Sequence, residues 1–171
     1  MARNSKLSRL VLTGDKELIA KLNGLGGRVY RKVVARASRK AFAPVAKDAK
    51  AKAPKETGLL KKSMGVKQKR YPRAGRIITL VGPRTGFATD VTVNTPSGER
   101  TMRRDPVKYA HLVEYGTAPH SIKIGDGEPY QHPGGAPKPF MRPAFDNNES
   151  RAKQIMRSEL AAGVVREAKS K

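Results

Sequence analysis

The chain has 171 residues, of which 37% are hydrophobic and 5% aromatic, and its formal net charge is +22. This length suits one domain with a modest core. The absence of cysteine excludes disulfides, thiolate metal ligands and a cysteine nucleophile. No apolar run approaches the roughly 18 residues of a membrane span, and the N-terminus lacks the apolar segment of a signal peptide. We therefore expect no membrane contact.

Residues 1–13 are predicted to form a basic, flexible arm, followed by a single domain over residues 14–171. Asp15 is a candidate N-cap for a short helix that ends near Leu22. A long helix is then predicted over residues 28–51, with Pro44 as a kink. Small apolar residues recur along it at every fourth position and form a narrow stripe: Val29, Val33, Ala37, Ala41, Val45 and Ala49.

The basic residues are concentrated in this first part of the chain. Through Arg76 there are 22 basic residues against 4 acidic ones, and from Ile77 onward there are 14 against 10. Such an excess of positive charge usually binds the phosphates of nucleic acid. The other interpretation is that these basic residues form a solvated helix face. We expect non-specific contact with DNA through a basic face of the long helix, made by Arg28, Arg31, Arg36, Arg39 and Lys40.

Beyond Lys62 the apolar period changes to two, which indicates strands. Residues 64–68 and 77–81 are predicted to pair as a hairpin. Residues 88–93 and 99–103 are predicted to form a second, polar hairpin within an insertion at 84–105. Such a hairpin either protrudes, pairs with a neighbouring subunit's sheet, or is a tolerated loose insertion.

Residues 118–138 are rich in glycine and proline and are expected to be loop, with one short strand at 121–124. A second long helix is predicted over residues 147–168. The expected fold class is therefore α+β, with long N-terminal and C-terminal helices packed on a small antiparallel β-sheet and with a polar hairpin insertion.

The sequence holds no pattern that indicates catalysis. Its three histidines, His111, His120 and His132, form no pair at metal-ligand spacing, and no serine lies in a nucleophile motif. We therefore nominate no catalytic, metal or cofactor residue, and we predict that the protein is not an enzyme.

Two short tracts have the character of docking segments. The first, residues 109–117, reads YAHLVEYGT, and the second, residues 138–145, reads KPFMRPAF. Glu114 is expected to cap a helix or to pair with an arginine, inside the fold or across a subunit boundary. Tyr115 and Phe140 serve either as docking contacts or as intramolecular core. As residues of an oligomer interface we nominate Glu114, Tyr115, Phe140 and Arg142.

These two tracts, together with APKETGLLKKS at residues 53–63, resemble the neck and tail-completion family of long-tailed bacteriophages. The resemblance implies a structural virion protein, a ring-forming head–tail connector that joins head to tail around the DNA channel. Its implied partners are further copies of itself, phage head-completion proteins, tail-tube proteins and passing DNA. The implied location is the neck of the virion, after assembly in the host cytoplasm.

A stand-alone basic nucleic-acid-binding protein, ribosomal or nucleoid-like, is the alternative function. Against it, the chain has no helix-turn-helix, zinc-finger or RNA-recognition signature, and its nearly neutral second half would have no role.

Overall fold

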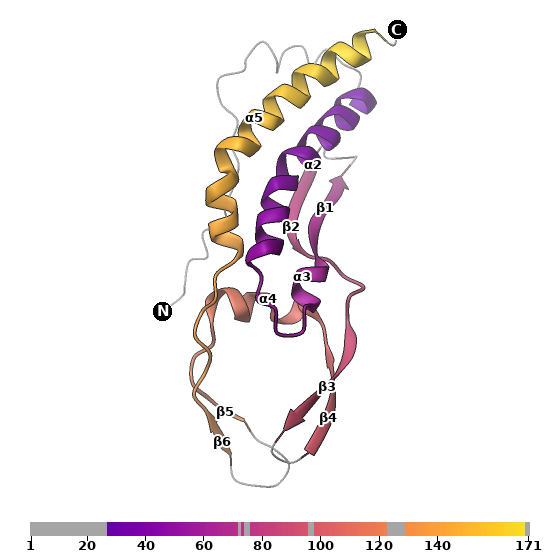
Figure 1. Ribbon diagram of the computed structural model, residues 1–171. Coiled ribbons are helices and arrows are strands. Elements are labelled where there is room, and N and C mark those ends of the chain that lie inside the picture. Colours follow the sequence, from indigo (N-terminus) through magenta and orange to yellow (C-terminus); the bar gives the residue numbers. More distant parts are fainter. Residues whose placement is uncertain (1–26, 72, 74–75, 96–97, 123–128, 170–171) are drawn as a thin grey trace.

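The computed structural model describes residues 27–71, 73, 76–95, 98–122 and 129–169. The predicted basic arm and the predicted helix capped by Asp15 lie outside the described residues. The α+β class is confirmed, because two long helices combine with short antiparallel sheets (Figure 1). The elements follow in the order α2 (Gly27–Lys52), α3 (Leu59–Ser63), β1 (Met64–Tyr71), β2 (Arg76–Pro83), β3 (Thr89–Thr95), β4 (Gly98–Arg104), α4 (Pro106–Tyr115), β5 (His120–Ile122), β6 (Tyr130–His132) and α5 (Met141–Ala168).

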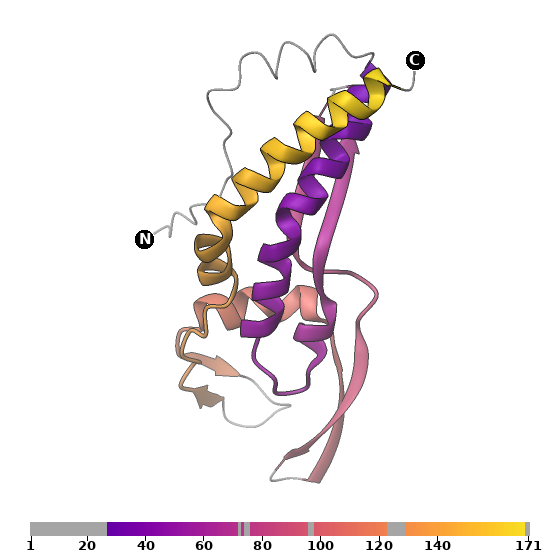
Figure 2. The same ribbon diagram turned by 45° about the horizontal axis from the view of Figure 1, so that its top comes forward.

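The long helices α2 and α5 lie side by side in both views (Figures 1 and 2). The stripe predicted from the sequence forms this contact, since Val33, Ala37 and the other described members are buried. On α5, Gly163 makes the close approach possible. A Cβ at Gly163 would lie 2.4 Å from Cγ1 of Val33, well inside van der Waals contact. α2 also continues without interruption through Pro44.

The opposite side of α2 packs on the β1–β2 hairpin. Its register places Val66 opposite Val81 and Gln68 opposite Thr79, which confirms the first predicted hairpin. α5 packs chiefly on α2 rather than on this hairpin, so α2 is the middle layer of the body. The small side chains of α2 allow this, because they let a neighbour approach from two directions.

α3 and α4 lie near the middle of the molecule, and the two remaining hairpins lie at the end away from the long helices (Figure 1). β3 and β4 pair over their full length, which confirms the polar hairpin, and this hairpin projects away from the helical body in both views. That it is an insertion stays a prediction. β6 was predicted as loop, and this was wrong: Tyr130 pairs with Ile122 and His132 with His120.

α5 begins at Met141, six residues earlier than the predicted start at 147. Pro143 lies in its first turn, where a missing backbone N–H costs little. Phe140, just before the helix, is buried in a core that joins α2, α3, β1, α4 and α5. The other buried members of this core are Ala49, Ala53, Leu60, Met64, Ala110 and Ala144.

Candidate functional site

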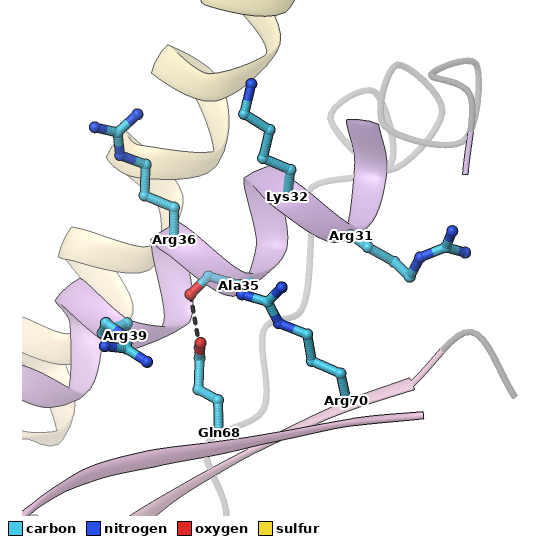
Figure 3. A pocket seen from close by; sticks show the side chains of 7 residues that line it. All are labelled: Arg31, Lys32, Ala35, Arg36, Arg39, Gln68 and Arg70. Carbon is cyan, nitrogen blue, oxygen red and sulfur yellow. Dashed lines mark hydrogen bonds between the residues drawn. The ribbon is translucent and has the colours of Figure 1, made fainter. Parts of the chain in front are cut away.

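A basic depression of about 490 Å³ lies between the first half of α2 and β1 (Figure 3). We call it the arginine groove. Arg70 extends from β1 toward α2, and the other basic side chains come from successive turns of the helix. The lining residues are Arg31, Lys32, Ala35, Arg36, Arg39, Gln68 and Arg70.

Hydrogen bonds from Gln68 hold the floor of the groove. Its Nε2 donates to the carbonyl oxygen of Ala35 at 2.6 Å and to Oγ of Ser38 at 2.9 Å. Oγ1 of Thr79 lies 3.0 Å from the same Ser38 hydroxyl. These contacts tie both strands of the hairpin to one turn of α2. The distance between the helix and the strand that carries Arg70 is therefore fixed by the protein itself.

Lys32, which lines the groove, and Lys40 both form ion pairs with acidic residues of α5. Nζ of Lys32 lies 3.0 Å from Oε1 of Glu167, and Nζ of Lys40 lies 2.6 Å from Oε1 of Glu159. The hydrogen bond from Lys40, despite some opposition from desolvation, holds the pKa of Glu159 below its usual value. These ion pairs join the two long helices, and each offsets the positive charge of its lysine.

The arginines of the groove differ from these lysines. Within the described ranges, Arg31, Arg36, Arg39 and Arg70 form no salt bridge with an acidic side chain. Arg36 acts on Glu159 only through the longer-range field. An arginine keeps its charge at any physiological pH, so the groove carries a standing excess of positive charge.

The structure thus brings together three of the five basic residues nominated from the sequence. Arg31, Arg36 and Arg39 line the groove, whereas Lys40 is tied to Glu159. Arg28 lies on α2, but its side chain is outside the described part. Arg70 was missed, although the alternation that places Gln68 toward α2 also places Arg70 there, two residues further on.

The second candidate site is the junction between α4 and α5. Glu114, on α4, is only 7% exposed, and its carboxylate accepts three backbone hydrogen bonds from the start of α5. Oε2 accepts from the N–H groups of Phe140 at 2.7 Å and Met141 at 2.9 Å, and Oε1 accepts from Arg142 at 3.0 Å. Because α5 has no acidic residue in its first turn and no side-chain cap of its own, Glu114 supplies both functions from another helix.

Backbone contacts complete the junction. The N–H of Lys138 donates to the carbonyl of Val113 at 2.8 Å, and Thr117 and Gly135 exchange two hydrogen bonds of 3.0 and 3.1 Å. Gly116 ends α4 with a φ of 71°, and a Cβ there would lie 2.5 Å from the carbonyl oxygen of Gly135. A glycine is therefore required at this position. The two tracts identified in the sequence form one structural unit.

The four nominated interface residues separate into two pairs. Glu114 and Phe140 are buried within the subunit, where they hold α5 against α4. Tyr115 is 52% exposed, and Arg142 is also exposed, so these two side chains lie on the outer surface of the junction. Val107 and Leu112 of α4 are also exposed, and Leu112 lines a depression of about 590 Å³ together with Tyr109 and Val113.

The described histidines do not form a metal site. His120 and His132 stack with ring centroids 5.0 Å apart. In the part of the chain that the structure describes, however, no three His, Asp or Glu side chains gather as metal ligands do. Among the described helices, none is long and apolar enough to cross a membrane.

The family model described as "Bacteriophage HK97-gp10, putative tail-component" matches residues 16–116, more than half of the chain. The protein belongs to this family of bacteriophage tail components, which agrees with the neck and tail-completion resemblance seen in the sequence. As a tail component it is a structural part of the virion. Neither the curated proteins nor the solved structures contain a match. The second tract, at residues 138–145, lies beyond the matched range, yet Glu114 connects it to the matched part.

Proposed function

We propose that the protein is a ring-forming subunit of the phage neck that completes the tail and connects it to the head around the DNA channel. The observation that carries the proposal, within a family of tail components, is the separation of two surfaces. An arginine groove lies along the helical body, and a region of nearly balanced charge with exposed apolar side chains lies at the junction end. A connector needs both, because it must hold its neighbours and must also tolerate a polyanion in its channel.

In this proposal, copies of the chain meet through the junction. Residues 84–140 carry 7 basic and 6 acidic side chains, so this end can approach another copy with little repulsion. Tyr115 and Arg142 make the contact, because aromatic and arginine side chains are the usual anchors of interfaces. Glu114 and Phe140 contribute from inside by fixing where these two anchors lie. Phage head-completion and tail-tube proteins occupy the two open faces of the ring.

The basic face of α2 is then directed to the channel. Arg28, Arg31, Arg36 and Arg39 provide most of its positive potential, to which Lys40 adds little because it is paired with Glu159. This potential attracts phosphate without reading sequence. Passing DNA must be held loosely, and contacts that salt can screen satisfy that requirement.

A phage that lacks this gene tests the proposal. Negative-stain microscopy should show unjoined heads and tails, and the wild-type gene supplied in trans should restore joined particles. Arg142→Glu should fail to restore them, because it reverses a charge at the contact. Arg151→Glu, an equally large change at another exposed position of α5, should succeed.

Normally joined particles in the absence of the gene would overturn the neck assignment. If the purified monomer then bound duplex DNA tightly and saturably at physiological salt, the stand-alone nucleic-acid-binding function would replace it.

A further inference from the structure

We propose that the arginine groove is a phosphate-binding site for the backbone of duplex DNA, in which Arg70 of β1 acts together with Arg31, Arg36 and Arg39 of α2. The biological setting, DNA that passes through the neck, rests on the proposed function. The site itself rests on the groove's own charge and geometry.

The first argument is the unbalanced charge. Four guanidinium groups from two elements surround one depression, and none of them forms a salt bridge with a described acid. The neighbouring lysines, in contrast, are paired with Glu159 and Glu167 of α5. Like charges at close range repel, so this arrangement is stabilised most by an anion that enters the groove.

The second argument is spacing. Arg31 and Arg39 are eight residues apart on one helix, which corresponds to about 12 Å along the helix axis. One DNA strand carries a phosphate for about every 3.4 Å of axis, so this length spans three to four successive phosphates. Arginine suits the role, because its planar fork donates two parallel hydrogen bonds to phosphate oxygens.

The third argument concerns which polyanion fits. Among the described residues no aromatic side chain lines the groove, so these residues offer no platform on which unstacked bases could lie. Ala35 is the one apolar residue in the described lining, whereas an acidic peptide partner would be expected to insert apolar anchors as well. Duplex DNA, contacted through its backbone alone, meets these conditions.

The groove is also pre-organised. Nε2 of Gln68 donates a hydrogen bond of 2.6 Å to the carbonyl oxygen of Ala35, which fixes β1 against α2. Arg70 lies two residues further along the same face of the strand. In Figure 3 Arg70 reaches from β1 toward α2 before any ligand arrives, whereas the side chain of Arg36 leaves the opposite side of the helix, toward α5. For Arg70, less ordering is required on binding as a result.

Salt-titrated binding of the full-length protein to duplex DNA of two unrelated sequences tests the site. The groove variant changes Arg31, Arg36, Arg39 and Arg70 to Gln. Its matched control changes Lys47, Lys50, Lys61 and Lys62 to Gln, which removes the same charge from positions outside the groove. Circular dichroism verifies that both variants fold.

The groove variant should lower the slope of log K against log salt by about 3 to 4, because each phosphate contact contributes about 0.9. The affinity advantage of the wild type over this variant should therefore shrink about 100-fold between 50 and 200 mM salt. The control should retain most of the slope, and neither DNA sequence should be preferred. Arg70→Gln alone should lower the slope by about as much as Arg39→Gln.

Equal losses in the groove variant and in its control would overturn the site, since net charge alone would then explain binding. If Arg70→Gln left the slope of log K against log salt unchanged, β1 would not be part of the DNA-binding site. A groove variant that binds DNA normally but fails to join heads to tails would assign the groove to a protein partner instead. Because joining and DNA binding are measured separately, the neck function can stand if the groove fails, and the groove can stand if the neck function fails.

Discussion

Residues 27–83 carry 17 basic side chains against 2 acidic ones, whereas residues 84–140 carry 7 against 6. In the first segment the arginines of α2 and β1 face an open groove without a described acidic partner. In the second, the carboxylate of Glu114 is buried and accepts three backbone hydrogen bonds. Charge thus serves opposite purposes at the two ends. At one end it lies open without a described acidic partner, and at the other it fixes two helices to each other.

The largest effect is expected from removing the carboxylate of Glu114. Glu114→Ala should lower the free energy of unfolding by about 3–5 kcal/mol, because three N–H groups at the start of α5 lose a charged acceptor. Glu114→Gln should cost less, since its amide oxygen still accepts. Urea unfolding at neutral pH measures both changes.

Glu99→Ala is the matched control, because Glu99 is an exposed glutamate on the β3–β4 hairpin, and it should change stability by less than about 0.5 kcal/mol. If Glu114→Ala were as mild as this control, the junction would not depend on the cap.

The same carboxylate marks how far the sequence could predict the fold. α2 was predicted to within a residue at each end, and both long hairpins were found, because periodicity and turn residues are local signals. The start of α5 was placed six residues late, at residue 147. The actual cap comes from Glu114, 27 residues before Met141, and only the tertiary structure brings the two together.

The candidate sites show the same limit. The basic face of α2 was visible because its residues are close in sequence. Arg70 was not included, since its place beside α2 depends on how the β1–β2 hairpin packs. Nor could the sequence separate Lys40 from its arginine neighbours, because the acid that pairs with it, Glu159, lies on α5.

A smaller effect should come from the contact between the long helices, where packing rather than charge decides. Gly163→Val should destabilise the protein by about 2–3 kcal/mol, because the new side chain would overlap Val33. Val33 is β-branched and is held in one preferred rotamer on a helix, so it cannot turn aside. Thermal unfolding measures the loss.

Ala161→Val tests the same substitution at an exposed position of α5 and should cost less than about 1 kcal/mol. Combining Gly163→Ala with Val33→Ala should cost less than the sum of the two single changes, since the smaller partner makes room. Equal effects of Val at positions 161 and 163 would show that the helices are not in such close contact.

The smallest change in stability should come from the most charged surface. Changing Arg31, Arg36, Arg39 and Arg70 to Gln should leave the free energy of unfolding within about 0.5 kcal/mol of the wild type, or raise it slightly at low salt. No salt bridge with a described acid is lost, and mutual repulsion is relieved. Lys40→Gln, which breaks the ion pair with Glu159, should instead destabilise the protein slightly. Urea unfolding at 20 and 200 mM salt measures both. A groove variant that lost several kcal/mol would show that these arginines hold the fold together, and the contrast between a displayed charge and a structural one would fail.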